Sequence, residues 1–166
     1  MRTFIVFVVS CLMLIHSSLV FGFTGWKQGT AEDGSPFAYN IQNKPETHGQ
    51  VRLFLQRSNG FPMLIISFKP FNPTIERLEK VKEALGPTRL IIDDKEVADY
   101  KKTTWRKVAD KTLQAKLILS TQAIQGLKSG KKLRVLVLVA NVDKEYDPSL
   151  EFQLEGLSHL MSKVLN

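Results

Sequence analysis

The chain has 166 residues, a formal net charge of +7 and one cysteine, Cys11. A lone cysteine can form neither an internal disulfide nor a cysteine-based zinc site, so the sequence excludes both. The excess of lysine and arginine favours anionic partners such as glycans, lipid headgroups or acidic proteins, although a basic soluble protein with no such partner has the same composition.

The first segment, residues 1–22, has the pattern of a secretory signal peptide. Met1–Thr3 is a short, positively charged start and Phe4–Ile15 is a mainly apolar run. Val20 and Gly22 are residues that suit the positions just before a cleavage site. We therefore expect cleavage after Gly22 and a protein that is periplasmic or secreted.

The alternative is an uncleaved segment that anchors the protein in the inner membrane. The apolar run is shorter than the roughly 20 residues that span a bilayer comfortably, and extending it through Leu19–Phe21 gives only a marginal span. Cys11 lies too early in this run for a lipoprotein cleavage site. Cleavage would remove Cys11, so the mature chain would have no catalytic thiol and no disulfide partner.

After the signal peptide, residues 23–166 are expected to form a single mature domain. Residues 23–50 are rich in Gly, Ser, Asn and Pro and predict an extended lead-in, with a short strand at 37–41. Residues 51–166 predict a β-rich domain, because short apolar or alternating runs recur there between turn residues.

The predicted elements of this domain follow one another at a spacing of about ten residues. Strands are expected at 51–57, 63–68, 88–93, 102–108, 112–120, 133–140 and 149–154. Helices are expected where apolar residues recur at helical spacing, at 74–85, at 121–128 and from Gly156 onward. This order predicts a mainly β fold, an antiparallel β-sandwich or partly open barrel with two or three short peripheral helices.

The second half of the chain carries features in a recognisable order. A strand ends in Asp-Asp-Lys, a Trp-Arg pair follows, a short helix leads through a lysine-rich turn into a strand, and Leu-x-Gly-Leu-Ser enters a last helix; these occupy 90–95, 105–106, 123–133 and 150–160. With Gly25-Trp26 near the mature start, this order resembles the invasion-associated locus B family of exported bacterial proteins. The resemblance implies a periplasmic or secreted β-rich domain, connected in some bacteria with host-cell entry, and it implies no catalytic residues.

Two features depart from the family pattern. Family members often carry cysteine pairs, whereas the expected mature chain has none, so no disulfide-dependent property is carried over. The helix expected at 74–85 is also longer and more charged than the loop that is usual at this place.

The sequence gives little support to a catalytic or metal site. His48 and His159 have no second ligand at metal-binding spacing, and the adjacent Asp93 and Asp94 suit a hairpin turn better than acid–base chemistry. No phosphate loop, nucleophile elbow or dinucleotide motif occurs, so we expect no metal and no cofactor. The alternative, a secreted hydrolase or lyase with an unrecognised carboxylate site, requires these acidic and histidine side chains to converge.

The strongest binding candidate is a basic cluster around Trp105. In a strand, Trp105 and Lys107 would share one face. Arg106 and Lys102 would share the other, and Lys101 precedes them. A tryptophan between cations can stack on a sugar, a lipid headgroup or a partner's side chain, and the structural alternative is a core tryptophan beside a solvated cationic edge.

We therefore expect a non-enzymatic protein of the envelope or host interface that acts by binding. Export disfavours nucleic acid as its partner. The sequence does not specify the oligomeric state.

Overall fold

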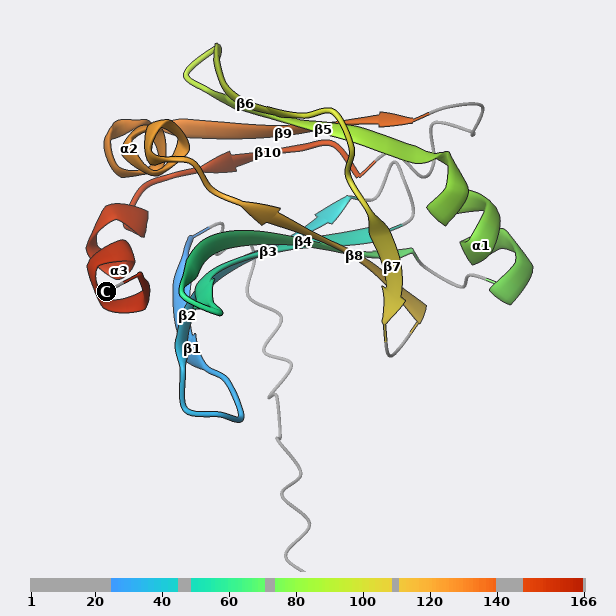
Figure 1. Cartoon of the computed structure of the whole chain (residues 1–166), viewed down its shortest axis with the longest axis horizontal. Helices are drawn as coiled ribbons and strands as arrows, with labels where there is room; N and C mark the ends of the chain where they lie inside the picture. The colour runs from blue at the N-terminus through green and yellow to red at the C-terminus, as the bar shows by residue number, and fades with distance from the viewer. Residues whose placement is uncertain (1–24, 45–48, 71–73, 109–110, 140–147, 166) are drawn as a thin grey trace, which may run out of the picture.

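The computed structural model describes residues 25–44, 49–70, 74–108, 111–139 and 148–165. Its strands form a six-stranded and a four-stranded antiparallel sheet, which lie face to face as two layers (Figure 1). The predicted mainly β fold with short helices is therefore confirmed. Of the two predicted architectures the molecule has the sandwich, because neither sheet closes into a barrel.

The six-stranded sheet has the order β1-β2-β3-β4-β8-β7. Its strands are β1 (Lys27–Thr30), β2 (Pro36–Lys44), β3 (Gly49–Ser58), β4 (Phe61–Pro70), β7 (Trp105–Val108) and β8 (Thr112–Ile118). The central β3–β4 hairpin turns at Asn59 and Gly60, which both have positive φ, as a two-residue type I′ turn requires. The strands expected at 51–57 and 63–68 are thus neighbours in the sheet.

The four-stranded sheet has the order β10-β9-β5-β6. Its strands are β5 (Leu85–Ile92), β6 (Lys95–Tyr100), β9 (Lys132–Val139) and β10 (Leu150–Gln153). The β5–β6 hairpin turns at Asp93 and Asp94, again with positive φ at both residues. The sequence did not predict β6, since Lys-Glu-Val-Ala-Asp-Tyr is largely polar, and pairing with β5 makes it an edge strand.

The three helices cap the two ends of the sandwich, with α1 (Ile75–Ala84) at one end and α2 (Thr121–Ser129) and α3 (Leu157–Val164) at the other (Figure 1). Their starts follow from local chemistry. The side chains of Thr74 and Ser120 accept hydrogen bonds from the backbone amides of Arg77 and Ala123, respectively, and so cap α1 and α2. Gly156, with a φ of 80°, precedes α3. All three predicted helices are confirmed.

The hydrophobic core lies between the sheets and beneath the helices. Its largest fully buried side chains come from both sheets and all three helices; they are Phe68, Phe152, Leu53, Leu55, Leu64, Ile66, Leu78, Leu90, Leu113, Leu127, Leu133 and Leu157. Burial of each such side chain contributes roughly 1.5–3 kcal/mol to folding. The two sheets are therefore held in a fixed relation by packing.

The segment predicted as an extended lead-in contributes two strands to the six-stranded sheet. β2 pairs with β3 over its length, and the strand predicted at 37–41 lies within it. Ala38 and Asn40 are buried, and the indole Nε1 of Trp26 donates to the backbone carbonyl of Gln153 at 2.9 Å. The sheet thus begins before residue 51, and the expected short strand at 37–41 is the central part of a longer strand that pairs with β3.

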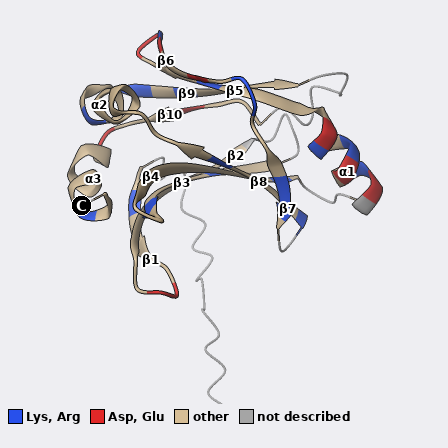
Figure 2. Ribbon diagram, viewed as in Figure 1, with Lys and Arg blue, Asp and Glu red and all other residues tan. Residues whose placement is uncertain are grey.

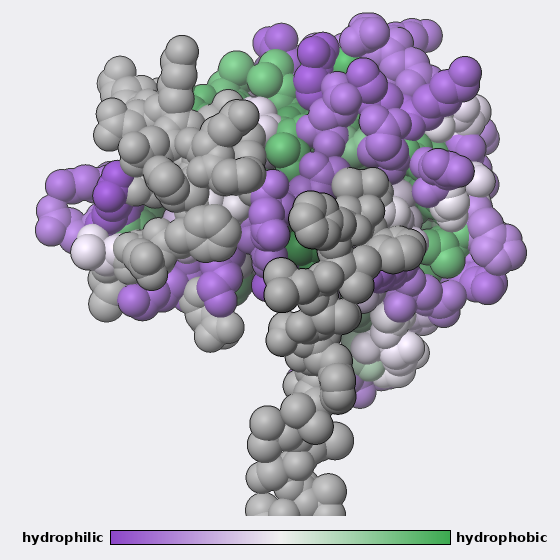
Figure 3. All heavy atoms as spheres, turned by 180° about the vertical axis from the view of Figure 1, so that it is seen from behind, coloured by the Kyte–Doolittle hydropathy of each residue, from purple (hydrophilic) through white to green (hydrophobic). Residues whose placement is uncertain are grey.

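The expected signal peptide and its cleavage site lie outside the described residues. In the part of the chain that the structure describes, no helix has the length and apolar character needed to cross a membrane. Seen from behind, the described surface is mostly hydrophilic, with small hydrophobic areas between charged side chains (Figure 3).

Candidate binding surface

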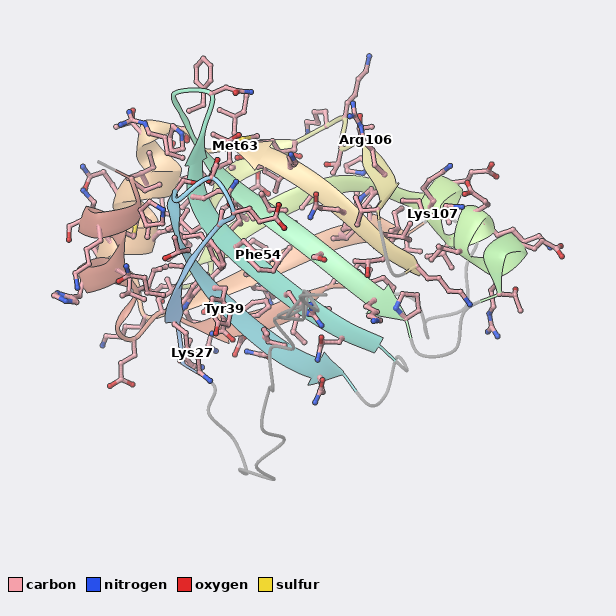
Figure 4. The ribbon with its side chains drawn as sticks, turned by 90° about the horizontal axis from the view of Figure 1, so that it is seen from below. Lys27, Tyr39, Phe54, Met63, Arg106 and Lys107 are labelled. Carbon is pink, nitrogen blue, oxygen red and sulfur yellow. The ribbon has the colours of Figure 1, made fainter. Side chains whose placement is uncertain are left out.

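The six-stranded sheet has one face toward the core and one that points away from the four-stranded sheet, which we call the outer face. Successive strand residues point to opposite faces, so residues such as Leu53 and Leu64 enter the core while their neighbours lie on the outer face. Figure 4 looks onto the outer face, where Tyr39, Phe54 and Met63 lie on adjacent strands. The helices lie at the ends of the sandwich and leave this face open among the described residues.

Three aromatic rings cluster on the β2–β3 part of the outer face. Phe37 and Tyr39 of β2 and Phe54 of β3 have ring centroids between 5.8 and 6.4 Å apart, in tilted and edge-to-face arrangements. Such ring contacts stabilise a pair by about 0.5–1.5 kcal/mol beyond area burial. Because each ring is half-buried against the others, the cluster forms an ordered apolar area.

Exposed hydrophobic side chains are concentrated on the same face. Of the five large ones among the described residues, four occupy outer-face positions, namely Ile41, Phe61, Val108 and Ile118. Phe61 and Ile118 are the most exposed, at 56% and 54%. They lie close together, because Met63 follows Phe61 on this face of β4 and pairs with Ile118. The fifth, Leu138, belongs to β9 of the other sheet.

The outer face is also cationic. None of the six strands contains an aspartate or a glutamate, and their outward positions carry Lys27, Arg52, Lys69, Arg106 and Lys116. Arg106 and Lys116 form no ion pair within the described chain. Figure 2 shows blue positions on these strands, and red at the β1–β2 turn and on helix α1 beside them.

The four-stranded sheet, in contrast, neutralises its outward cations across its strands. The nitrogen-to-oxygen distances are 3.7 Å for Arg89–Glu96, 3.8 Å for Arg89–Asp99, 3.1 Å for Lys132–Glu151 and 4.0 Å for Arg134–Asp94. The excess positive charge of the described domain is therefore not spread evenly. On the outer face of the six-stranded sheet, Arg106 and Lys116 have no carboxylate partner among the described residues.

A cavity of about 320 Å³ opens on this face over β7 and β8. Its lining is Thr104, Arg106, Val108, Gln114 and Lys116, and Arg106 lies opposite Gln114 in the strand register. A guanidinium, an ammonium, an amide and a hydroxyl thus surround one hollow. This arrangement offers an anion several hydrogen-bond donors, two of them charged.

The structure separates the members of the predicted basic cluster. Trp105 is 5% exposed and belongs to the core, opposite Ala115 of β8. Its indole is therefore withdrawn from any ligand at the surface, because burying an aromatic of this size in the core is more favourable than leaving it at an edge. Lys107 lies on the same side, as predicted, and its Nζ is 3.3 Å from an oxygen of Glu79 on α1.

The remaining members lie around the start of β7. Lys101 and Lys102 lie in the bend between β6 and β7 and are exposed. Lys101 is paired with Asp99. Of the five predicted residues, only Arg106 combines an outward strand position with a place in the cavity (Figure 4).

Asp93, which was considered above for acid–base chemistry, has a structural role in the β5–β6 turn. Its carboxylate oxygens accept hydrogen bonds from the backbone amides of residues 131–132 at 3.0 to 3.1 Å, which ties the β5–β6 turn to the start of β9. Asp94 and His159 are exposed, and His48 lies outside the described residues. In the described ranges, no group of three or more His, Cys, Asp or Glu residues could hold a metal ion.

Sequence reasoning missed the aromatic cluster and Lys116. The alternation of Phe37, Tyr39 and Ile41 was the available signal, and it was obscured by the Gly- and Asn-containing flanks. Lys116 stands on the polar side of a correctly predicted strand. Its proximity to Arg106 depends on the β7–β8 pairing, which the sequence pattern does not contain.

Comparisons with known proteins support the fold. No protein-family model matches the chain, and no curated protein matches it. Among solved structures, the chain is similar to the crystal structure of invasion-associated protein B from Bartonella henselae, with a TM-score of 0.55 and 16% sequence identity over 84% of this chain and 91% of that one. The resemblance predicted from the sequence is thus confirmed for the fold.

Proposed function

We propose that this protein is an exported, non-enzymatic binding protein of the envelope or host interface, and that its outer face binds an anionic partner. One observation carries the proposal. Arg106 and Lys116 line the same cavity, and neither has a carboxylate partner among the described residues. Their charges are therefore available to an anion from outside.

The composition of the cavity favours binding over catalysis. Among the described residues, its lining includes no carboxylate, histidine or cysteine, which are the usual general bases and activated nucleophiles of enzymes. The lining residues supply positive charge and hydrogen-bond donors instead. The apolar side chains nearby add contact area, as in interfaces where an arginine and aromatic residues supply most of the binding free energy.

Export and a role at the cell boundary have separate support. The pattern of residues 1–22 is that of a secretory signal peptide. The solved structure with the similar fold is described as an invasion-associated protein. We extend that association to this chain as part of the proposal.

The binding role is tested by removing the two cavity cations. The double variant Arg106→Gln, Lys116→Gln is compared with wild type for binding to immobilised dextran sulfate at several salt concentrations. Each cation near an anionic surface contributes about 1 kcal/mol, so affinity should fall about 30-fold, with a shallower dependence on salt.

The matched control is Lys95→Gln, Lys128→Gln, which removes the same charge at exposed positions of β6 and α2. This control should bind nearly as wild type does. Equal losses in both double variants would show that net charge alone drives the binding and would contradict a site at Arg106 and Lys116.

Export is tested by mass. Intact protein recovered from a fractionated cell should have the mass of a chain that starts at Phe23 and should be found in the periplasm or the medium. Full-length protein in the inner-membrane fraction would show that the protein is anchored in this membrane and is not secreted. Full-length protein in the cytosol would contradict this part of the proposal.

A further inference from the structure

We infer that the anionic partner is a phospholipid bilayer, which the protein contacts with the β4–β8–β7 half of its outer face. This inference rests on the proposed function and names the partner class. The cavity with Arg106 and Lys116 would receive a headgroup phosphate. Phe61 and Ile118 would enter the interfacial layer beside it.

Exposed apolar and cationic side chains are combined on this half of the outer face. Phe61, Ile118 and Val108 are exposed at 56%, 54% and 38%, and all three share the outer face with Arg106 and Lys116. Lys116 and Ile118 are two residues apart on β8 and so point to the same side. Apolar side chains that enter the interface next to cations that attract anionic headgroups are how peripheral proteins bind membranes.

The position of the acidic residues also favours an anionic bilayer. The strands of this half carry none, and the acidic β1–β2 turn with Glu32 and Asp33 follows β1, which forms the opposite edge of the sheet (Figure 2). Beside β7, helix α1 does carry carboxylates, and two of them have cationic partners. Glu76 is 2.7 Å from Lys80, and Glu79 is bound by Lys82 and Lys107.

The apolar side chains of this surface fit a bilayer better than an anionic glycan. Sulfated or acidic sugars pair with cations and stack on open aromatic faces, but exposed aliphatic side chains such as Ile118 offer them little. Phe61 is an exposed ring beside the aliphatic Ile118, and the clustered rings of Phe37, Tyr39 and Phe54 are half-buried and tilted against one another. The clustered rings therefore present no flat stacking platform, whereas a bilayer interface accepts both the aliphatic and the cationic groups.

The cations of this surface fit an anionic bilayer better than a second copy of the chain. A two-fold dimer places the same patch on both sides of its interface. Here that arrangement would bring two copies of a cationic patch together, with no carboxylate on the six strands to pair with Arg106 and Lys116. Charge repulsion disfavours this dimer, and an anionic surface relieves the repulsion.

The experiment uses protein recovered after export and prepared identically for every variant, so that all share one N-terminus. Co-sedimentation is measured with vesicles of phosphatidylcholine alone and with vesicles that also contain phosphatidylglycerol. Wild type should bind the vesicles that contain phosphatidylglycerol at least tenfold more tightly than the vesicles of phosphatidylcholine alone. Phe61→Ser, Ile118→Ser should lower that affinity by at least tenfold, since burial of each large apolar side chain is lost, and it should leave binding to dextran sulfate unchanged.

The matched control is Leu138→Ser, which removes an aliphatic side chain that is 42% exposed on the four-stranded sheet. This variant should bind anionic vesicles as wild type does. Full vesicle binding by Phe61→Ser, Ile118→Ser would overturn the lipid inference. If Arg106 and Lys116 still governed dextran sulfate binding in that case, the proposed function would stand. The lipid inference would also be overturned if the wild-type protein formed a dimer that Phe61→Ser, Ile118→Ser dissociates.

Discussion

Replacing Asp93 by alanine should destabilise the protein by about 2–3 kcal/mol through the turn that it organises. The carboxylate receives three backbone contacts of 3.0 to 3.1 Å from the amides of residues 131 and 132. Hydrogen bonds to a charged acceptor contribute about 1.5–3 kcal/mol, and the lower end applies because the side chain is exposed and water can replace it. Asp93 also has a φ of 47°, and alanine in that left-handed conformation costs about 1 kcal/mol more.

Two companion variants divide this effect into its parts. Asp93→Asn keeps a residue that tolerates positive φ and keeps one acceptor oxygen, so it should cost about 1 kcal/mol or less. Asp94→Asn removes only a 4.0 Å contact with Arg134 from a side chain that is 88% exposed, and it should change stability by less than about 0.5 kcal/mol.

The assay is urea unfolding followed by circular dichroism, in which each loss appears as a lower midpoint at an unchanged slope. If Asp93→Ala and Asp94→Asn unfolded at the same midpoint as wild type, the structural role assigned to Asp93 would be refuted. Asp93 would then have no structural role at this turn, and it would again be a candidate catalytic carboxylate for the hydrolase alternative.

Three further outcomes are expected. Trp105→Ala should cost about 3–5 kcal/mol because the indole is buried, whereas Trp105→Phe should leave dextran sulfate binding unchanged; a selective loss of binding in Trp105→Phe would show that the indole contacts the ligand. Gly130→Ala should destabilise by about 1–3 kcal/mol in urea unfolding, since its Cβ would lie 2.3 Å from Cγ2 of Ile92; an unchanged midpoint would contradict the packing of α2 on β5. Burial raises the pKa of Tyr100 above its ordinary 10.0, so the unfolded chain loses the phenol proton first and stability should fall as pH rises beyond about 10. The variant Tyr100→Phe should lose less stability over this pH range, and identical alkaline stability profiles of the two proteins would contradict this role of Tyr100.

Local patterns predicted the parts of the fold that local chemistry determines. Asn59-Gly60 between two apolar runs is a strong hairpin signal, and Thr74 and Ser120 are capping residues placed just before amphipathic stretches. Strand β6 was missed because its register is imposed by β5 and not by its own alternation. Strand β1 was missed, and β2 was predicted only at 37–41, because turn-forming residues surround these strands.

Of the residues on the binding surface, only Arg106 was predicted from the sequence. Arg106 was selected for its neighbours in sequence, whereas its neighbours in space come from β8, and Gln114 and Lys116 join it only through the sheet order. The burial of Trp105 depends on which face of β7 meets the core. A sequence pattern shows that two faces alternate and does not show which of them is covered.

The most direct test of the account asks which sheet face meets the anionic partner. Cys11 is the only cysteine in the sequence and would be lost with the signal peptide, so a single cysteine can be introduced in the mature protein at Ile118→Cys or at Leu138→Cys and labelled with an environment-sensitive dye. The two sites are similarly exposed, at 54% and 42%, on opposite sheets. Addition of phosphatidylglycerol vesicles or of dextran sulfate should change the dye emission at position 118 and leave it unchanged at position 138. A change confined to position 138, or no change at either site despite measured binding, would contradict the outer face as the binding surface.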